Sequence, residues 1–181
     1  FKDHALQDSS APKLDSSFYI ELIEPFEHNS QALGLDIATE KNRQEAAIRS
    51  MKSGHPTLTK KILLVQANKK GPGFLYMMPI YQGVQIPQDE AEREKKLIGW
   101  TYTPIVASDL VETALSLVST PPQIKIYEDD IRENNLLYSS TVASGNRAFN
   151  VDWSKTIQMG GQKWIIQGAH TGVSFWNIYN M

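Results

Sequence analysis

The sequence predicts an α+β fold with two antiparallel sheets, each covered by helices on one side and joined by a helix over residues 108–118. Two observations predict it. Strand-forming segments at residues 58–66 and 74–81 are separated only by a short glycine-containing connection, as in an antiparallel hairpin. After residue 120 the sequence changes to short strand-forming segments with turns at glycine and asparagine, typical of a second antiparallel sheet.

The first elements follow from side-chain type and from capping residues. Residues 18–23 are rich in aromatic and β-branched side chains and stop before a proline, which predicts a buried strand. Thr39 is suited to cap a helix that Gly54 ends in a left-handed conformation. Ala47 and Met51 lie four residues apart, so we expect one side of this helix to be buried.

The middle of the chain leads from the first lobe to the second. We expect residues 85–96 to form an exposed loop with a helical turn, and residues 98–106 to form a strand. The expected domains are residues 1–106, the first lobe, and residues 107–181, the linking helix with the second lobe. The strands expected in the second lobe are residues 124–127, 136–139, 148–153, 155–159, 163–169 and 174–179.

The linking helix is expected to contact both sheets. Its apolar side chains recur at helical spacing, with Leu110, Ala114 and Leu117 in one stripe. We therefore expect that stripe to be buried, and a charge placed at Leu117 to be strongly destabilising.

Composition excludes several classes of protein. The chain of 181 residues is 41% hydrophobic and 21% charged with a net charge of -2, so it is neither a disordered chain nor a basic nucleic-acid binder. It contains no cysteine, which removes disulfides, thiolate metal sites and cysteine nucleophiles. No apolar run reaches the roughly 18 residues that a membrane-spanning helix needs.

No catalytic or metal-binding motif is present. The sequence has no G-x-S-x-G, H-E-x-x-H, Walker or G-x-G-x-x-G motif, and its four histidines lack metal-ligand spacing. The acidic run Glu128, Asp129 and Asp130 is interpreted as solvated charge at a strand end rather than as an acid–base pair. We expect no metal, no cofactor and no enzyme activity in this fragment.

One enzyme alternative stays open. A hydrolase would need a nucleophile and a base from distant segments, such as Ser17 or Ser174 with His55 or His170. A second alternative is a protein–protein interaction module without a small-molecule ligand, for which the apolar residues 173–179 offer a contact surface.

An ordered series of blocks identifies a family resemblance. The blocks ALGLDIATEKNRQEA, ILLVQ, FLYMMPIY and IGW lie within roughly residues 18–115. Together they resemble a CHASE domain, the extracytoplasmic sensory module of bacterial histidine kinases, nucleotide cyclases and plant cytokinin receptors. The resemblance implies that the helices that precede this point in the family are missing from this sequence.

The resemblance implies a function and an architecture. It implies two PAS-like lobes with a small-molecule ligand in the first, and a periplasmic location as part of an inner-membrane protein. The parent would be a histidine kinase or a GGDEF-type diguanylate cyclase, anchored in the membrane and homodimeric at full length. The implied ligand-binding residues are Tyr19, Gln31, Ile37, Asn42, Leu64, Val65, Met77 and Trp100.

The resemblance also bears on the ligand. Cytokinin-binding CHASE domains place an acidic side chain directly before the helix arginine and a threonine two residues before a strand proline. Here Asn42 precedes Arg43, and Met77 lies two residues before Pro79. We therefore expect a small, more apolar or amide-compatible ligand and little affinity for cytokinins. The alternative for Asn42 is a solvent-facing position in the first turn of its helix.

Overall fold

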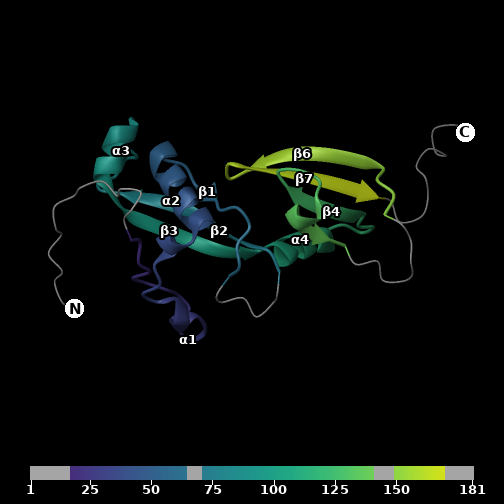
Figure 1. The fold of residues 1–181 in the computed structure, drawn as a ribbon, viewed down its shortest axis with the longest axis horizontal. Helices are drawn as coiled ribbons and strands as arrows, with labels where there is room; N and C mark the ends of the chain where they lie inside the picture. The colour runs from purple at the N-terminus through teal and green to yellow at the C-terminus, as the bar shows by residue number, and fades with distance from the viewer. Residues whose placement is uncertain (1–16, 65–70, 141–148, 170–181) are drawn as a thin grey trace, which may run out of the picture.

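The computed structural model describes residues 17–64, 71–140 and 149–169. This part of the chain is α+β with two antiparallel sheets, as the sequence predicts. Figure 1 shows the two sheets toward opposite ends of an elongated molecule, with α4 lying against the second sheet. The strands of the first sheet, in spatial order, are β1 (Thr57–Leu58), β2 (Gly73–Tyr81) and β3 (Leu97–Val106).

Helix α2 (Lys41–Ser53) covers one face of the first sheet. Its N-cap is Glu40 rather than the predicted Thr39, because the Glu40 carboxylate accepts the backbone N–H groups of Asn42 and Arg43. Gly54 ends the helix at a φ of 73°, as predicted. The other helices of this lobe are α1 (Phe26–Asn29), η1 (Ser30–Ala32), η2 (Ile37–Thr39) and α3 (Glu90–Lys96).

The predicted strand at residues 18–23 is wrong. Phe18 and Ile20 are buried, but the segment forms only an isolated bridge between Tyr19 and Asp36. The reason is that the Phe18 N–H donates to the Asp36 side chain instead of to a neighbouring strand.

The predicted strand at residues 58–66 is shorter than expected. Regular strand structure is limited to the two residues of β1, and one further isolated bridge joins Ile62 to Gly73. Between them the Thr59 hydroxyl accepts the Leu75 N–H at 3.0 Å, so a side chain replaces a backbone group in the ladder. Residues 65 and 66 lie outside the described part.

Helix α4 (Ala107–Ser116) joins the lobes, but through a different face from the predicted one. Ala107 and Val111 are buried, whereas Leu117 is 85% exposed and Leu110 39% exposed. The helix begins one residue earlier than expected, directly after β3, and this directs positions 107, 111 and 115 toward the sheets. The predicted Leu110, Ala114 and Leu117 stripe lies mostly on the solvent side.

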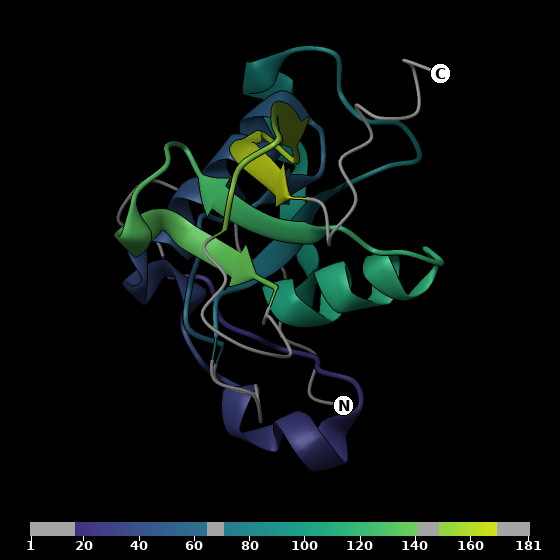
Figure 2. The same ribbon diagram turned by 90° about the vertical axis from the view of Figure 1, so that its right-hand side faces the viewer.

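The second sheet has the spatial order β5-β4-β7-β6. Figure 2 shows α4 beside it. The strand predicted at residues 148–153 is wrong for residues 149–152, since β6 begins at Trp153. The strand predicted at residues 174–179 lies outside the described part. The strands are β4 (Gln123–Glu128), β5 (Leu136–Ser139), β6 (Trp153–Met159) and β7 (Gln162–Ala169), with η3 (Glu133–Asn135) before β5.

Two hydrophobic clusters form the core. One lies inside the first lobe, between α2 and the sheet. The other crosses from the first lobe to the second, since it contains Leu58 and Phe74 together with Trp164. The Phe74 and Trp164 rings lie 5.2 Å apart. The predicted boundary after residue 106 stays a prediction, and this shared cluster spans it.

Candidate functional site

The interior of the first lobe brings four of the eight predicted site residues together. Ile37, Leu64 and Met77 belong to its buried cluster, and Trp100 packs against it. The Trp100 indole lies 4.6 Å from the Phe18 ring and donates a hydrogen bond to the Ala47 carbonyl oxygen at 2.9 Å. These side chains come from η2, from β2 and β3, and from the segment after β1.

The other four predicted residues lie elsewhere. Tyr19 is 64% exposed and Gln31 is also exposed, so neither faces the cluster in this structure. Asn42 is half-buried and donates through Nδ2 to the Lys61 carbonyl oxygen at 3.3 Å. Its side chain therefore bonds to the protein and does not simply face solvent. Val65 lies outside the described residues.

A small space remains in the first lobe, between the segment before α2, the start of α2 and the inner face of β2 and β3. Its volume is about 10 Å³, room for about one water molecule and far below that of a ligand site. A ligand would therefore require the walls to move apart. The lining residues are Ile20, Ala32, Leu35, Ile37, Arg43, Leu64, Leu75 and Tyr102.

Arg43 and Tyr102 are the polar members of this lining, and neither was among the predicted site residues. Arg43 is 8% exposed and donates through Nη2 to the Leu63 carbonyl oxygen at 3.0 Å. Burial raises the pKa of the Tyr102 hydroxyl, and the nearby Arg43 charge partly opposes that shift. A signal for Arg43 exists in the sequence, because it lies four residues before Ala47 on the buried side of α2.

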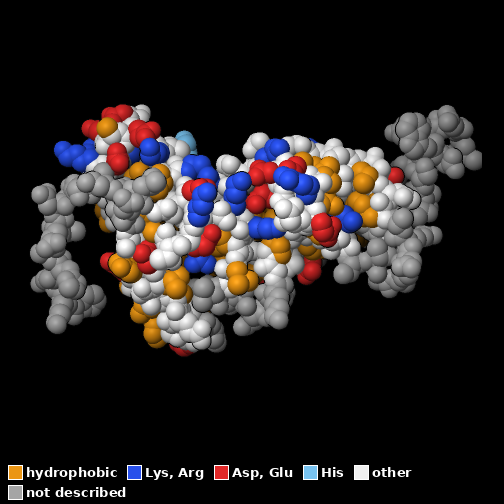
Figure 3. All heavy atoms as spheres, viewed as in Figure 1, with side chains coloured by type: hydrophobic (Ala, Val, Ile, Leu, Met, Phe, Trp, Pro, Cys, Tyr) orange, Lys and Arg blue, Asp and Glu red, His pale blue; other side chains and the backbone are white. Residues whose placement is uncertain are grey.

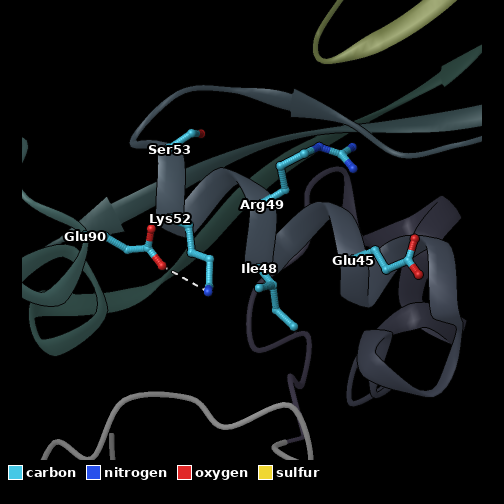
Figure 4. A pocket seen from close by; sticks show the side chains of 6 residues that line it. All are labelled: Glu45, Ile48, Arg49, Lys52, Ser53 and Glu90. Carbon is cyan, nitrogen blue, oxygen red and sulfur yellow. Dashed lines mark ion pairs between the residues drawn. The ribbon is translucent and has the colours of Figure 1, made fainter.

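A larger depression lies on the outer side of α2. It has a volume of about 500 Å³ and is lined by Ile48, Arg49, Lys52, Ser53 and Glu45 from the helix and by Glu90 from α3. In Figure 4 these side chains diverge instead of pointing to one centre, and the Lys52–Glu90 ion pair lies across one side. The depression is open. Arg49 Nε is buried without a hydrogen-bond partner, but the Arg49 side chain points away from the other lining residues and donates through Nη2 to the Leu58 carbonyl oxygen, so the depression is the weaker candidate.

The two lobes meet at the backbone of Leu58. Its N–H donates to the Gly160 carbonyl oxygen at 2.8 Å, in the turn between β6 and β7. Its carbonyl oxygen accepts from Gln162 Nε2 at 2.9 Å and from Arg49 Nη2 at 2.7 Å. One residue of the first sheet thus bonds both to α2 and to the second lobe.

A second contact between the lobes is acidic. Glu128 is buried and accepts the Lys61 N–H at 3.0 Å, and Asp129 pairs with Lys60 at 2.8 Å. The interpretation of this run as solvated charge is therefore wrong for Glu128, because the strand end points into the junction and not into solvent. Burial raises the pKa of the Glu128 carboxyl, and the Lys61 N–H opposes that rise.

The described part of the chain shows no metal cluster and no helix that could cross a membrane. Its His, Asp and Glu side chains form no group of three or more suited to hold a metal ion. None of its helices is both long and apolar enough to span a bilayer. On the face in Figure 3, acidic and basic side chains lie intermingled, so it presents no extended basic surface.

Comparison with protein families agrees with this architecture. The family model of the CHASE domain matches residues 2–138, well over half of the chain. No curated protein matches the sequence. The chain therefore belongs to the CHASE domain family, the non-catalytic extracellular sensor domains of signalling proteins.

Proposed function

We propose that this chain is the ligand-binding sensor of a membrane-bound signalling protein and that a small molecule binds in the first lobe, between α2 and the inner face of β2 and β3. The observation that supports this most is the space at that position. Its lining is apolar except for two side chains, Arg43 and Tyr102, and small-molecule sites have this composition.

The wall most able to move is the segment before α2. It forms only an isolated bridge and three short helical turns, η1, η2 and α1, of three or four residues each. The backbone hydrogen bonds that hold this segment together include those from the Ile20 N–H to the Leu35 carbonyl oxygen and from the Gly34 N–H to the Ile20 carbonyl oxygen. A wall with few regular hydrogen bonds opens at lower cost than a sheet, so we expect the ligand to displace it outward.

A path of hydrogen bonds leads from α2, which contributes Arg43 to this pocket, to the second lobe. Asn42 on α2 donates to the Lys61 carbonyl oxygen, and the Lys61 N–H donates to Glu128 at the end of β4. A ligand that moves α2 would pull on this path. Such a ligand signals only if it binds two arrangements of the lobes unequally.

The proposed parent is a histidine kinase or a GGDEF-type diguanylate cyclase with this domain in the periplasm. Membership of the CHASE family supports an extracytoplasmic sensor in a signalling protein. We further propose that the full-length protein is a homodimer, and that the enzyme activity belongs to its cytoplasmic domain. The ligand is proposed to be a small and largely apolar molecule other than a cytokinin, because Asn42 and Met77 replace the charged and hydroxyl groups expected for cytokinin binding.

A protein–protein interaction module is the second candidate, and one observation favours it. The outer face of the first sheet exposes a row of apolar side chains, Tyr76, Met78 and Ile80, each 42 to 47% exposed. These alternate along β2 with buried residues, so the row lies opposite α2. Residues 173–179, the contact surface that the sequence offers, lie outside the described part.

Native mass spectrometry of the protein as purified tests the sensor proposal. We expect a retained small molecule, and we expect Ala32→Phe to abolish retention because Ala32 is 1% exposed and lines the space. Ala91→Phe, on the exposed side of α3, is the matched control and should retain the molecule. A molecule held equally by both variants would place the site elsewhere, and protein that is always empty argues against the proposal.

A further inference from the structure

We infer that the ligand of the first lobe carries a carboxylate on a short apolar chain, and that Arg43 and Tyr102 bind this carboxylate. The inference rests on the proposed function and specifies its ligand class. The sequence predicts a ligand that is apolar or amide-compatible. In this inference the polar end of the ligand is an anion, and the rest of the ligand is still apolar.

The first reason is that the charge of Arg43 is incompletely compensated. The side chain is buried, and its Nε atom has no hydrogen-bond partner. Arg43 forms an ion pair with Glu40, but this pair is long, with 3.9 Å between Nε and the Glu40 oxygen, which is beyond hydrogen-bond distance. That carboxylate is already used, because it accepts the N–H groups of Asn42 and Arg43 at the start of α2. A buried guanidinium with one unpartnered N–H group and only a long ion pair is stabilised by an anion that bonds to it directly.

The second reason is the pairing of a guanidinium with a phenol. Arg43 on α2 and Tyr102 on β3 line the same space from opposite walls. A guanidinium matches a carboxylate in planar shape and charge, and a phenol adds one further donor to the same group. In an interior of low dielectric constant such charge-assisted hydrogen bonds are stronger than those to a neutral amide.

The third reason is the rest of the lining. Six apolar side chains surround the two polar ones: Ile20, Ala32, Leu35, Ile37, Leu64 and Leu75. They offer no hydrogen bond to a second polar end, so they suit an alkyl or aryl chain. A phosphate or a dicarboxylate would bring more charge than one guanidinium neutralises. A monocarboxylate of modest length fits the combination best.

Calorimetric titration with hexanoate and with its neutral isostere hexanamide tests the inference. We expect hexanoate to bind at least tenfold more tightly than hexanamide to the wild-type protein. Arg43→Met should lower the hexanoate affinity by about tenfold or more, the effect of one charged hydrogen bond. The same substitution should leave hexanamide binding within about twofold. Butanoate and octanoate bracket the length of the apolar chain.

Tyr102→Phe keeps the test valid if Arg43→Met fails to fold. It removes the hydroxyl and keeps the ring, so the fold is retained, and the hexanoate affinity should fall severalfold while that for hexanamide does not. Lys155→Met, at an exposed position on β6 outside the lining of the space, is the control and should change neither affinity by more than about twofold.

The outcomes separate this inference from the proposed function. Hexanamide binding as tightly as hexanoate, or hexanoate binding that survives both Arg43→Met and Tyr102→Phe, overturns the carboxylate and leaves a first-lobe ligand site in place. No binding of any of the three carboxylates also overturns it. The proposed function is tested separately. It fails if the purified protein retains no small molecule, or if Ala32→Phe does not remove the molecule that is retained.

Discussion

At the scale of single residues, Glu128 makes stability depend on pH. It is buried at the lobe junction, and desolvation raises its pKa above the ordinary value of 4.5. The folded protein therefore holds this proton more tightly than the unfolded chain does. It follows that Glu128 lowers the free energy of unfolding as pH rises from about 4.5 through the raised pKa.

Glu128→Gln should remove this dependence. The amide oxygen can still accept the Lys61 N–H but carries no charge to desolvate. We expect the variant to be more stable than wild type at pH 7, by on the order of 1 kcal/mol, and the difference to vanish near pH 4. Urea unfolding at a series of pH values measures it. If the free energies of unfolding of the two proteins changed in parallel with pH, Glu128 would not be the source of the pH dependence.

Sequence reasoning at this scale found apolar residues more reliably than charged ones. Met77 and Ile37 are buried as side chains of their type usually are. The burial of Arg43 and Glu128 depends on what lies opposite each in the folded chain, Leu63 and Lys61 among them, and neither partner is adjacent in sequence. Their burial is therefore a tertiary property that composition and spacing do not fix.

At the scale of elements, α4 shows why helix orientation is hard to predict. Its apolar residues lie on more than one side, so the sequence alone offers two candidate stripes. The close connection to β3 selects between them, because the Ala107 N–H donates to the Pro72 carbonyl oxygen at 3.0 Å and fixes the first turn.

Two matched substitutions, one on α4 and one at its C-cap residue, test that orientation. Val111→Asp places a charge in the shared cluster and should destabilise by about 3 kcal/mol or more. Leu117→Asp, at a side chain that is 85% exposed, should change the free energy of unfolding by less than about 0.5 kcal/mol. Chemical denaturation of both variants decides it, and equal losses would mean that the helix packs through another face.

The turn between β6 and β7 docks on the first lobe because glycine allows close approach. A Cβ at Gly160 would lie 2.8 Å from both the Leu58 backbone nitrogen and its Cγ, and the φ of Gly160 is 53°. Alanine there would combine strain with a clash against backbone.

Gly160→Ala should therefore cost more than the same change at a free glycine. Gly34 has a φ of 78° and nothing within 4 Å of a Cβ, so Gly34→Ala carries the backbone strain alone, about 1 kcal/mol. We expect Gly160→Ala to lose at least about 2 kcal/mol in total, judged by thermal unfolding. Similar losses in the two variants would show that the turn does not hold the lobes together.

The elements predicted best were those with local signals. Helix α2 follows from its periodicity and from Gly54, and β2 and β3 from their composition and the turns around them. The predicted strand at 18–23 failed because Asp36, far along the chain, takes the Phe18 N–H with its side chain. Such a competition between side chain and backbone leaves no mark in the pattern of residues.

At the scale of the whole molecule, the lobes share a core as well as polar contacts. Leu58 and Phe74 of the first sheet pack in one cluster with Ile124 and Trp164 of the second. Bonds at Leu58 and at Glu128 add directional contacts at the same junction. A displacement of α2 in the first lobe is thus expected to turn the second lobe as a rigid body relative to the first, since packed cores deform little.

Spin labels can report this movement without background labelling, because the chain contains no cysteine. Ala91→Cys on α3 and Gln158→Cys on β6 are exposed positions in the two lobes. We expect the distance between the labels to change when a stabilising ligand binds, and the change to shrink in Glu128→Ala. A ligand that leaves the distance distribution unaltered would make the domain a binder without a switch.

The most direct test of the central claim uses two neighbouring methionines on opposite faces of β2. Met77 is fully buried toward α2, whereas Met78 is 47% exposed on the outer face. In protein with carbon-13 methionine methyl groups, a small molecule that raises the melting temperature should shift the Met77 methyl resonance strongly and Met78 weakly. Shifts confined to Met78, or stabilisation with Met77 unchanged, would contradict a ligand site inside the first lobe and favour a docking surface on the outside of the sheet.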